Sequence, residues 1–241
     1  QGIFYSVKRG IPPAQSGYLI LGTGLGFGVP GYFAMTELGH MPAGFIPRAL
    51  WQACGCRQGG KTACVENYAA GRGIAQTARL LLDPAAADRL KSVSSGLNEL
   101  LAGRDLAKLA AASSLKDVPD PDAAAVMRLA ENQADGLAGF VADLAAEVTT
   151  WAIVTAAYLF GLRIVGIGER VALENPWHVE NIARRVSSYL SGATLLRPRL
   201  QVEATPLKDP AKYGALSLVI PVPEYGNWAA KMAGVDSGPG I

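Results

Sequence analysis

The chain has 241 residues, enough to bury a sizeable core as one large domain or two small ones. Half of its residues are hydrophobic and 17% are charged, which excludes an intrinsically disordered protein. The net charge is +2 and acidic and basic residues are interspersed, so no basic stripe indicates nucleic-acid binding. The three cysteines are clustered and no signal peptide is present, which favours the reducing cytoplasm.

The first apolar strand is predicted at Tyr18–Leu21, after a short lead that ends at Ile11-Pro12-Pro13. The strand runs directly into the glycine-rich stretch Gly22–Gly28. Such a turn lets a backbone approach phosphate closely, because glycine adopts positive φ freely and leaves N–H groups exposed. The stretch is therefore a candidate phosphate loop, with a tight hairpin as the alternative. Rossmann-type binding fits poorly, because Pro30 follows where a helix should begin.

All three cysteines and one of the two histidines lie between Glu37 and Asn67. Thiolate sulfur and imidazole nitrogen are donors that Zn²⁺ accepts, and one histidine with three cysteines is a standard structural zinc set. The alternative is three small buried thiols and one satisfied core histidine. The candidate metal ligands are His40, Cys54, Cys56 and Cys64.

Two carboxylates flank this set. Glu37 precedes His40 by three residues, and Glu66 follows Cys64 by two. Neither is needed for a zinc site that already has four ligands. Carboxylates fixed by a metal knot accept hydrogen bonds from sugar hydroxyls well, because ionised acceptors make the stronger bonds. The alternative is two ordinary surface acids.

Helices are predicted over Asn67–Leu82, within residues 85–115 and, as two consecutive helices, from Ala123 to about Gly161, with Asp122 as a cap. The second of the pair is apolar over Val148–Leu162. This run of about 15 residues is shorter than the ~20 needed to cross a membrane, so we interpret it as a buried core helix.

A short strand is predicted at Arg163–Gly168, where it ends in glycines, as in an α/β layer whose ligands lie beyond the carboxyl ends of strands. A helix follows at Glu174–Leu190, with Pro176 in its first turn. His178, in the same turn, is predicted to be a surface residue. The last strand is predicted at Leu200–Ala204.

The stretch around the cysteines resembles the ROK family, which comprises repressors, uncharacterised frames and sugar kinases. The family signature is Glu-x-Gly-His, a gap, and then Cys-x-Cys-Gly-x-x-Gly-Cys-x-Glu. The gap before Cys54 and the gap from Cys56 to Cys64 are longer here than usual, and insertions of this kind are tolerable because closure entropy grows slowly with length. The matching residues, in order, are Glu37, Gly39, His40, Cys54, Cys56, Cys64 and Glu66.

The resemblance implies an α/β fold: an actin-like ATPase (ribonuclease H-like) lobe over residues 1–225, with a Cys₃His zinc knot at 37–67. Residues 212–216 match the family's closing Gly-Ala-Ala helix, and residues 226–241 are treated as a polar tail. The family's catalytic Asp belongs to an N-terminal lobe, so we expect it upstream of Gln1 and expect no catalytic residue in this chain. The missing lobe would come from a longer polypeptide or from a partner chain.

The function implied by the resemblance is an ATP-dependent, glucokinase- or fructokinase-like sugar kinase that phosphorylates a hexose hydroxyl, with ATP and Mg²⁺ as cofactors and a homodimer as the assembly. Ile167 takes the place of the first glycine of a Gly-Gly that packs against adenosine in the family. The implied sugar-binding residues are Glu37, His40 and Glu66. The implied nucleotide-binding residues are Gly22, Thr23, Gly24, Gly26 and Gly168. The alternatives are a ROK-type transcriptional regulator and a catalytically inactive sugar-binding module.

Overall fold

A computed structural model describes residues 9–29, 37–56, 60–83, 85, 104–191 and 200–205. The described residues form two compact units. The first unit comprises residues 9–20, 26–29, 153–191 and 200–205. The second comprises residues 21–25, 37–56, 60–83, 85 and 104–152. The predicted helix at 212–216 and the tail from 226 lie outside the described residues.

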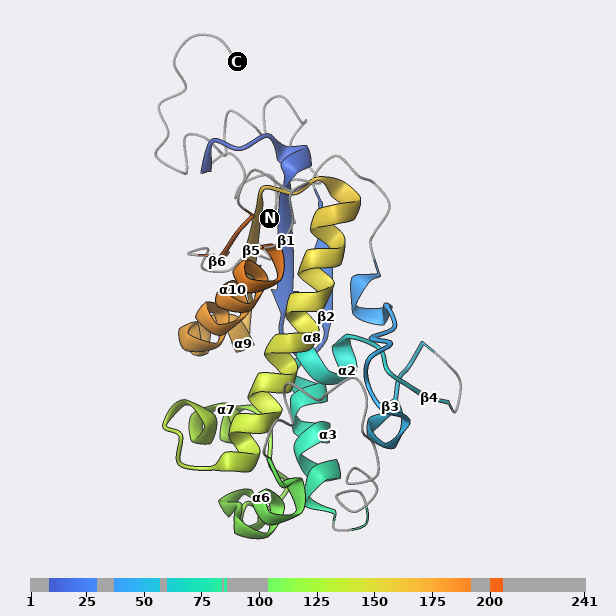
Figure 1. The fold of residues 1–241 in the computed structure, drawn as a ribbon, viewed down its shortest axis with the longest axis vertical. Coiled ribbons are helices and arrows are strands. Elements are labelled where there is room, and N and C mark those ends of the chain that lie inside the picture. Colours follow the sequence, from blue (N-terminus) through green and yellow to red (C-terminus); the bar gives the residue numbers. More distant parts are fainter. Residues whose placement is uncertain are drawn as a thin grey trace, which may run out of the picture. The chain divides into compact units, whose positions relative to one another are not determined.

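The first unit is built on a mixed sheet with strand order β2-β1-β5-β6 (Figure 1). Strand β1 (Ser16–Leu21) pairs in parallel with β5 (Ile164–Gly168), with Leu19 opposite Ile167. Strand β6 (Gln201–Ala204) continues the sheet in parallel with β5. Every residue of β5 is buried, as expected for a parallel strand covered on both faces. The three predicted strands in this part of the chain are confirmed.

The glycine-rich stretch is part turn and part strand. Only Gly22–Gly24 forms the turn, which is closed by a hydrogen bond from the Gly22 N–H to the Gly24 carbonyl at 3.1 Å. Strand β2 (Leu25–Gly28) then runs back along β1. Leu25 and Phe27 alternate with glycines and are buried, so the two-residue period of a strand prevails here. The stretch therefore forms a tight hairpin, and its turn at Gly22–Gly24 stays the candidate phosphate loop.

Two helices of the first unit connect β5 to β6 along the chain. Helix α9 (Arg170–Glu174) contacts β5, and α10 (Pro176–Leu190) contacts both α9 and β6. Pro176 occupies the first turn of α10, as predicted, where its missing N–H costs nothing. A short 3₁₀ turn, η1 (Pro13–Gln15), precedes β1. The predicted helix at Glu174–Leu190 is therefore confirmed as α10.

The prediction that His178 is a surface residue is wrong. His178 is fully buried, and its ring lies edge-on to that of Trp177 with centroids 5.5 Å apart. Residues 178, 182 and 186 recur at helical spacing, and Ile182 and Val186 are also fully buried. The first turn of a helix fixes the position of a residue along the axis but not the face on which it lies.

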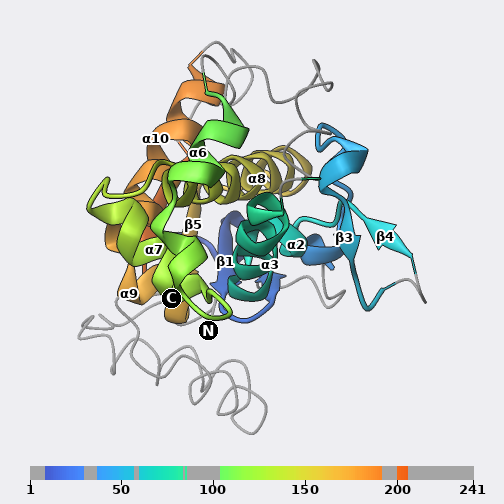
Figure 2. The same ribbon diagram turned by 90° about the horizontal axis from the view of Figure 1, so that it is seen from below.

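Helix α3 (Gly71–Leu82) is the centre of the second unit (Figure 2). It follows α2 (Glu66–Ala69), and the extended backbone of Ala70 separates the two, so the predicted helix at Asn67–Leu82 is interrupted. Helix α3 contacts α6 (Leu106–Ala112), η4 (Ser114–Asp117) and α7 (Ala123–Glu131).

Asp122 caps α7 by accepting a hydrogen bond from the Ala125 N–H at 2.8 Å, as predicted. Helix α8 (Gly136–Phe160) follows, which confirms the two consecutive helices. It is long and apolar enough to cross a membrane, but 72% of its most apolar 18-residue window is buried within the protein. That degree of burial is what a core helix of a soluble protein requires. Its residues as far as Ala152 belong to the second unit.

Candidate functional site

Short segments of the second unit carry the cysteines and the histidine. The 3₁₀ turn η2 (Leu38–His40) ends at the histidine, and a second turn, η3 (Arg48–Leu50), leads into an antiparallel pair of strands, β3 (Gln52–Ala53) and β4 (Lys61–Thr62). Cys54 directly follows β3, and Cys64 lies two residues after β4. The segment after η2 is joined to the segment after β4 by a hydrogen bond from the Val65 N–H to the Met41 carbonyl at 3.0 Å.

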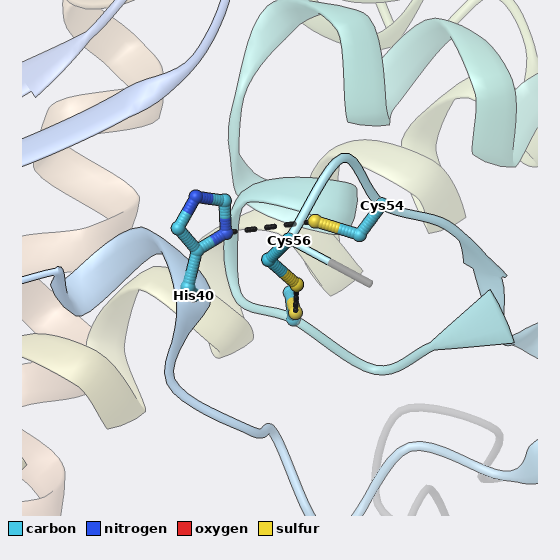
Figure 3. A group of neighbouring side chains, drawn as sticks. His40, Cys54 and Cys56 are labelled. Carbon is cyan, nitrogen blue, oxygen red and sulfur yellow. Dashed lines mark hydrogen bonds between the residues drawn. The ribbon is translucent and has the colours of Figure 1, made fainter. Parts of the chain in front are cut away.

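These segments bring the four predicted metal ligands together (Figure 3). One ligand atom from each residue can be chosen so that all four lie within 4.8 Å of one another. His40 Nδ1 lies 3.5 Å from Cys54 Sγ, and Cys56 Sγ lies 3.5 Å from Cys64 Sγ. A tetrahedral zinc with Zn–S bonds of about 2.3 Å separates its sulfur ligands by about 3.8 Å. The donor set and its spacing therefore fit a tetrahedral ion.

Two of the three thiols are buried. Burial raises the pKa of the Cys54 thiol, and it raises the pKa of Cys64 to about 12. At neutral pH these groups are thiols unless a cation stabilises the thiolates. The Thr62 hydroxyl donates to Cys64 Sγ at 3.0 Å, which supports negative charge on that sulfur.

Asn67 is a site residue that the sequence analysis missed, since it was treated there only as the start of a helix. It is buried, and its Nδ2 donates to the carbonyls of Gln52 at 3.2 Å and Thr62 at 3.4 Å. The same Nδ2 lies 3.4 Å from Thr62 Oγ1, which leaves the hydroxyl hydrogen for Cys64. Asn67 thereby ties β3 to β4 beneath the cysteines. The sequence signal that could have found it is an asparagine directly after the signature's last glutamate.

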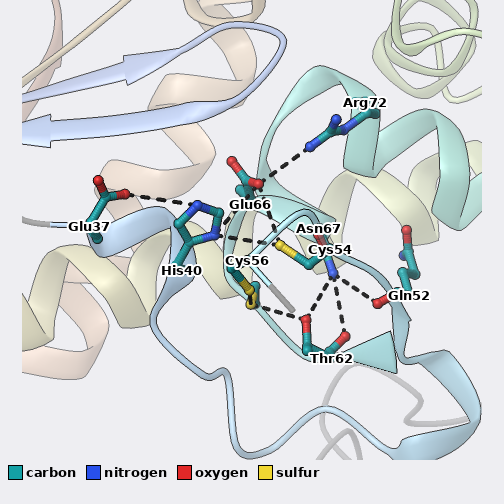
Figure 4. Close-up of polar contacts among 10 residues, drawn as sticks. Glu37, His40, Gln52, Cys54, Cys56, Thr62, Glu66, Asn67 and Arg72 are labelled. Atoms are coloured by element: carbon teal, nitrogen blue, oxygen red, sulfur yellow. Dashed lines mark hydrogen bonds and ion pairs between the residues drawn. The ribbon is translucent and has the colours of Figure 1, made fainter. Parts of the chain in front are cut away.

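The two flanking carboxylates face the two ring nitrogens of His40 (Figure 4). Glu66 Oε1 lies 3.7 Å from His40 Nδ1 and 3.7 Å from Cys54 Sγ. Glu37 Oε2 lies 3.9 Å from His40 Nε2. The Glu66 side chain is only 12% exposed, whereas that of Glu37 is 70% exposed. Glu66 is therefore not an ordinary surface acid. Glu37 is a solvent-exposed acid at the edge of the cluster.

The glycine turn lies against the same carboxylate. A Cβ atom built on Gly24 would be 3.3 Å from Glu66 Oε2. The start of α3 holds the turn, because the Gly71 N–H donates to the Gly22 carbonyl at 2.8 Å and the Arg72 N–H donates to the Thr23 carbonyl at 3.3 Å. Gly22, Thr23 and Gly24 are therefore brought together with the cysteine cluster in one unit.

Close packing explains why the third residue of the Glu-x-Gly-His motif is a glycine. A Cβ on Gly39 would lie 2.5 Å from the Leu25 carbonyl oxygen, immediately after the glycine turn. Only a residue without a side chain allows these two backbones to approach so closely. Gly39 thus fixes η2, and with it His40, against the hairpin.

The other two predicted nucleotide-binding residues belong to the first unit. Gly26 lies in β2, and Gly168 is the buried last residue of β5. A Cβ on Gly168 would lie 2.2 Å from Tyr18 Oη and 2.8 Å from Thr205 Cγ2. Close packing inside the unit therefore accounts for a glycine at this position. The Tyr18 hydroxyl is itself buried, and this burial raises its pKa to about 12.

The sequence and the fold of this chain are similar to those of known proteins. The ROK family profile matches residues 14–221. No curated protein sequence matches the chain significantly. A ROK hexokinase from Thermus thermophilus is 20% identical with a TM-score of 0.56, over 96% of this chain and 62% of that one. A ROK glucokinase from Streptomyces griseus, solved with glucose and AMPPNP, is 22% identical with a TM-score of 0.56, over 96% and 65%.

A ROK family transcriptional regulator, a homologue of the E. coli MLC protein, is 16% identical with a TM-score of 0.61, over 98% of this chain and 53% of that one. At these identities the likeness shows a shared α/β fold. The chain spans less than two thirds of the length of each of these three proteins. Because the family profile covers most of the chain and the signature residues meet in one cluster, the chain belongs to the ROK family.

Proposed function

We propose that this chain is the sugar-binding part of an ATP-dependent sugar kinase that transfers the γ-phosphoryl group of ATP to a hexose hydroxyl. One observation carries the proposal: Glu66 reaches the cysteine cluster with Oε1 and the Gly22–Gly24 turn with Oε2. An acceptor for a sugar hydroxyl is thus fixed beside a candidate phosphate turn. The fold shared with a ROK hexokinase and a ROK glucokinase supports the same reaction class.

In this proposal Glu37, His40 and Glu66 bind the sugar hydroxyls. Glu66 is held from several sides and is nearly buried, so it can accept a hydroxyl with little loss of side-chain entropy. The two ring nitrogens of His40 face different carboxylates, so one nitrogen can serve the cluster and the other a sugar hydroxyl.

Zn²⁺ is the proposed occupant of the cluster, held by His40, Cys54, Cys56 and Cys64. The ion would fix the knot that positions the sugar-binding residues, and we assign it no part in phosphoryl transfer. The spacing of the four donor atoms supports this assignment. Zinc binding would displace the protons of the buried Cys54 and Cys64 thiols, whose pKa values burial raises.

ATP with Mg²⁺ is the proposed phosphoryl donor. Main-chain groups of Gly22, Thr23 and Gly24, in the second unit, are proposed to contact its phosphates. Gly26 and Gly168, in the first unit, stay nucleotide-binding residues that only the family resemblance implies. The glucokinase solved with AMPPNP supports ATP as the donor. Phosphoryl transfer also needs a positioned base, and we propose that the family's N-terminal lobe, in the same polypeptide or a partner chain, supplies it. A cytoplasmic homodimer is proposed as the working form.

The test is a coupled ADP-release assay over a panel of hexoses, run on the 241-residue chain and on the product of its complete reading frame, alongside calorimetric sugar titration. We expect sugar-dependent ADP release from the complete protein, abolished by Glu66→Gln. Glu131→Gln, at the exposed end of α7, is the matched control and should behave as wild type. Hexose binding with no ADP release would reject the kinase.

A sugar-responsive transcriptional regulator is the second candidate. It is supported by the fold shared with a ROK family transcriptional regulator, with a TM-score of 0.61. Such a protein would keep the sugar site of Glu37, His40 and Glu66 and act through a separate DNA-binding region. Hexose binding without ADP release, together with sugar-dependent DNA binding by the complete protein, would favour this candidate over an inactive sugar-binding module.

A further inference from the structure

Arg72, the second residue of α3, makes two separate polar contacts. Its guanidinium Nη2 lies 3.4 Å from Glu66 Oε1 (Figure 4). Its backbone N–H donates to the Thr23 carbonyl in the glycine turn at 3.3 Å. One residue therefore contacts both the nearly buried carboxylate and the turn that lies beside it.

The side-chain contact bears on which oxygen of Glu66 is available. Oε1 is shared among Arg72 at 3.4 Å, His40 Nδ1 at 3.7 Å and Cys54 Sγ at 3.7 Å. The terminal torsion of a glutamate is broad and two-fold, so without such a partner the carboxylate rotates easily. A cation on Oε1 fixes Oε2 on the side of Gly24, where a sugar hydroxyl would be bound.

We propose that Arg72 is a positioning residue that fixes the orientation of Glu66 and holds the sugar site and the glycine turn together, an inference that rests on the proposed kinase function. A hydroxyl bound to Oε2 lies next to Gly24, and the main chain of Arg72 anchors the neighbouring Thr23. The Arg72 side chain thus restrains Glu66, and the Arg72 main chain restrains the turn. The planar guanidinium suits this task better than an ammonium group, whose direction is not fixed.

If the ion pair were purely structural, removing it would lower the melting temperature. The Arg72 side chain is 55% exposed, however, and an exposed pair contributes little to stability. Arg72→Gln should therefore leave the melting temperature nearly unchanged while it weakens sugar binding. Arg79→Gln is a matched control, because Arg79 lies on the same helix and pairs with Asp120 at 2.7 Å, away from Glu66.

The experiment is calorimetric titration with the hexose that the wild-type protein binds best, combined with melting curves. We expect Arg72→Gln to raise the sugar Kd about tenfold, the size of one charge-assisted contact, and Arg72→Lys to recover part of the loss. In a Glu66→Gln background, Arg72→Gln should cause little further loss, because the negative charge with which Arg72 pairs is gone. In kinetics, the KM for sugar should rise more than kcat falls.

The outcomes separate the inference from the proposed function. If wild-type protein binds no hexose, the kinase proposal falls and the inference falls with it. If wild-type protein and Arg72→Gln bind a hexose equally well, the inference alone is overturned. A loss of affinity that Arg79→Gln reproduces, or that persists in full in the Glu66→Gln background, would show that Arg72 acts through general electrostatics and not through Glu66.

Discussion

Glu66 Oε2 lies 3.3 Å from the point where a Cβ atom on Gly24 would stand. That separation is tighter than ordinary van der Waals contact, so a methyl group at Gly24 would press on the carboxylate proposed to bind the sugar. We expect Gly24→Ala to weaken hexose binding by about 1 kcal/mol or more, because Glu66 must shift or the turn must open. Isothermal titration calorimetry measures the change.

Gly44→Ala is the control for this substitution. A Cβ on Gly44 meets no atom within 4 Å, so the added methyl group should leave sugar affinity and stability nearly unchanged. Equal affinity in wild type and Gly24→Ala would mean that the turn and the carboxylate do not share a binding site.

Gly39 tests the packing of the Glu-x-Gly-His motif on the hairpin. Its Cβ position lies 2.5 Å from the Leu25 carbonyl oxygen, and backbone cannot move aside as a flexible side chain can. Gly39→Ala should lower the free energy of unfolding by about 1–3 kcal/mol, the range for strain imposed on a packed backbone. Urea denaturation compares it with Gly44→Ala, and a similar stability for the two variants would contradict the close approach.

The cysteine cluster makes a prediction about metal content. Purified protein should hold about one zinc per chain, and Cys64→Ala should lose it and be destabilised on the order of several kcal/mol, because structural zinc binding is part of the folding free energy. Elemental analysis and melting curves with and without a chelator measure both effects. Protein made with zinc available that nevertheless contains none would rule this assignment out.

Thr62→Val is the matched variant for the metal. It keeps all four ligands and removes the hydroxyl that donates to Cys64 Sγ at 3.0 Å and accepts from Asn67 Nδ2 at 3.4 Å. Zinc should still bind, with an affinity lowered about tenfold, the smaller end of the range for losing an outer-shell partner. Competition with a chromophoric chelator measures the affinity.

Much of the site could be predicted from the sequence because its residues lie close together in the chain. His40 and the three cysteines meet as predicted, and Glu66 follows Cys64 so closely that the same knot fixes both. Strand β5 and helix α10 were also predictable, since continuous apolar runs and helical periodicity are local signals.

Other features depended on contacts between distant residues. The contact of Arg72 with Glu66 spans the break at Ala70 between α2 and α3, and no periodicity signals that break. The burial of His178 depends on which face of α10 meets its neighbours. Asn67 was missed because its partners Gln52 and Thr62 come from another segment.

Asp135 gives the second unit a pH-dependent element of stability. It is 4% exposed, and its carboxylate accepts hydrogen bonds from the Ser113 hydroxyl at 2.8 Å, the Ser114 N–H at 2.7 Å and the Ala138 N–H at 2.9 Å. Burial by itself opposes ionisation, but these donors outweigh it and hold the pKa of Asp135 below its usual value. The ionised form is therefore the one that stabilises the fold.

We expect Asp135→Asn to cost about 1–3 kcal/mol at pH 7, because a neutral amide cannot accept all of these bonds. A depressed pKa in the folded state means that the stabilisation is complete above the unfolded-state pKa of about 3.9 and is lost as pH falls toward the folded-state value. Urea unfolding at pH 7 and below pH 4 should show the gap between wild type and variant closing on acidification. A gap that stays constant would contradict the assignment.

Glu169, between β5 and α9, holds a backbone conformation that favours glycine, with φ 72° and ψ 179°. Such a conformation costs a residue with a side chain on the order of 1–3 kcal/mol, and glycine adopts it at little cost. Glu169→Gly should therefore be more stable than Glu169→Ala by about 1 kcal/mol, since both lose the carboxylate and only alanine keeps the strain. Thermal or urea unfolding of the pair measures the difference, and equal stability, or a less stable glycine variant, would show that the backbone at 169 is not strained.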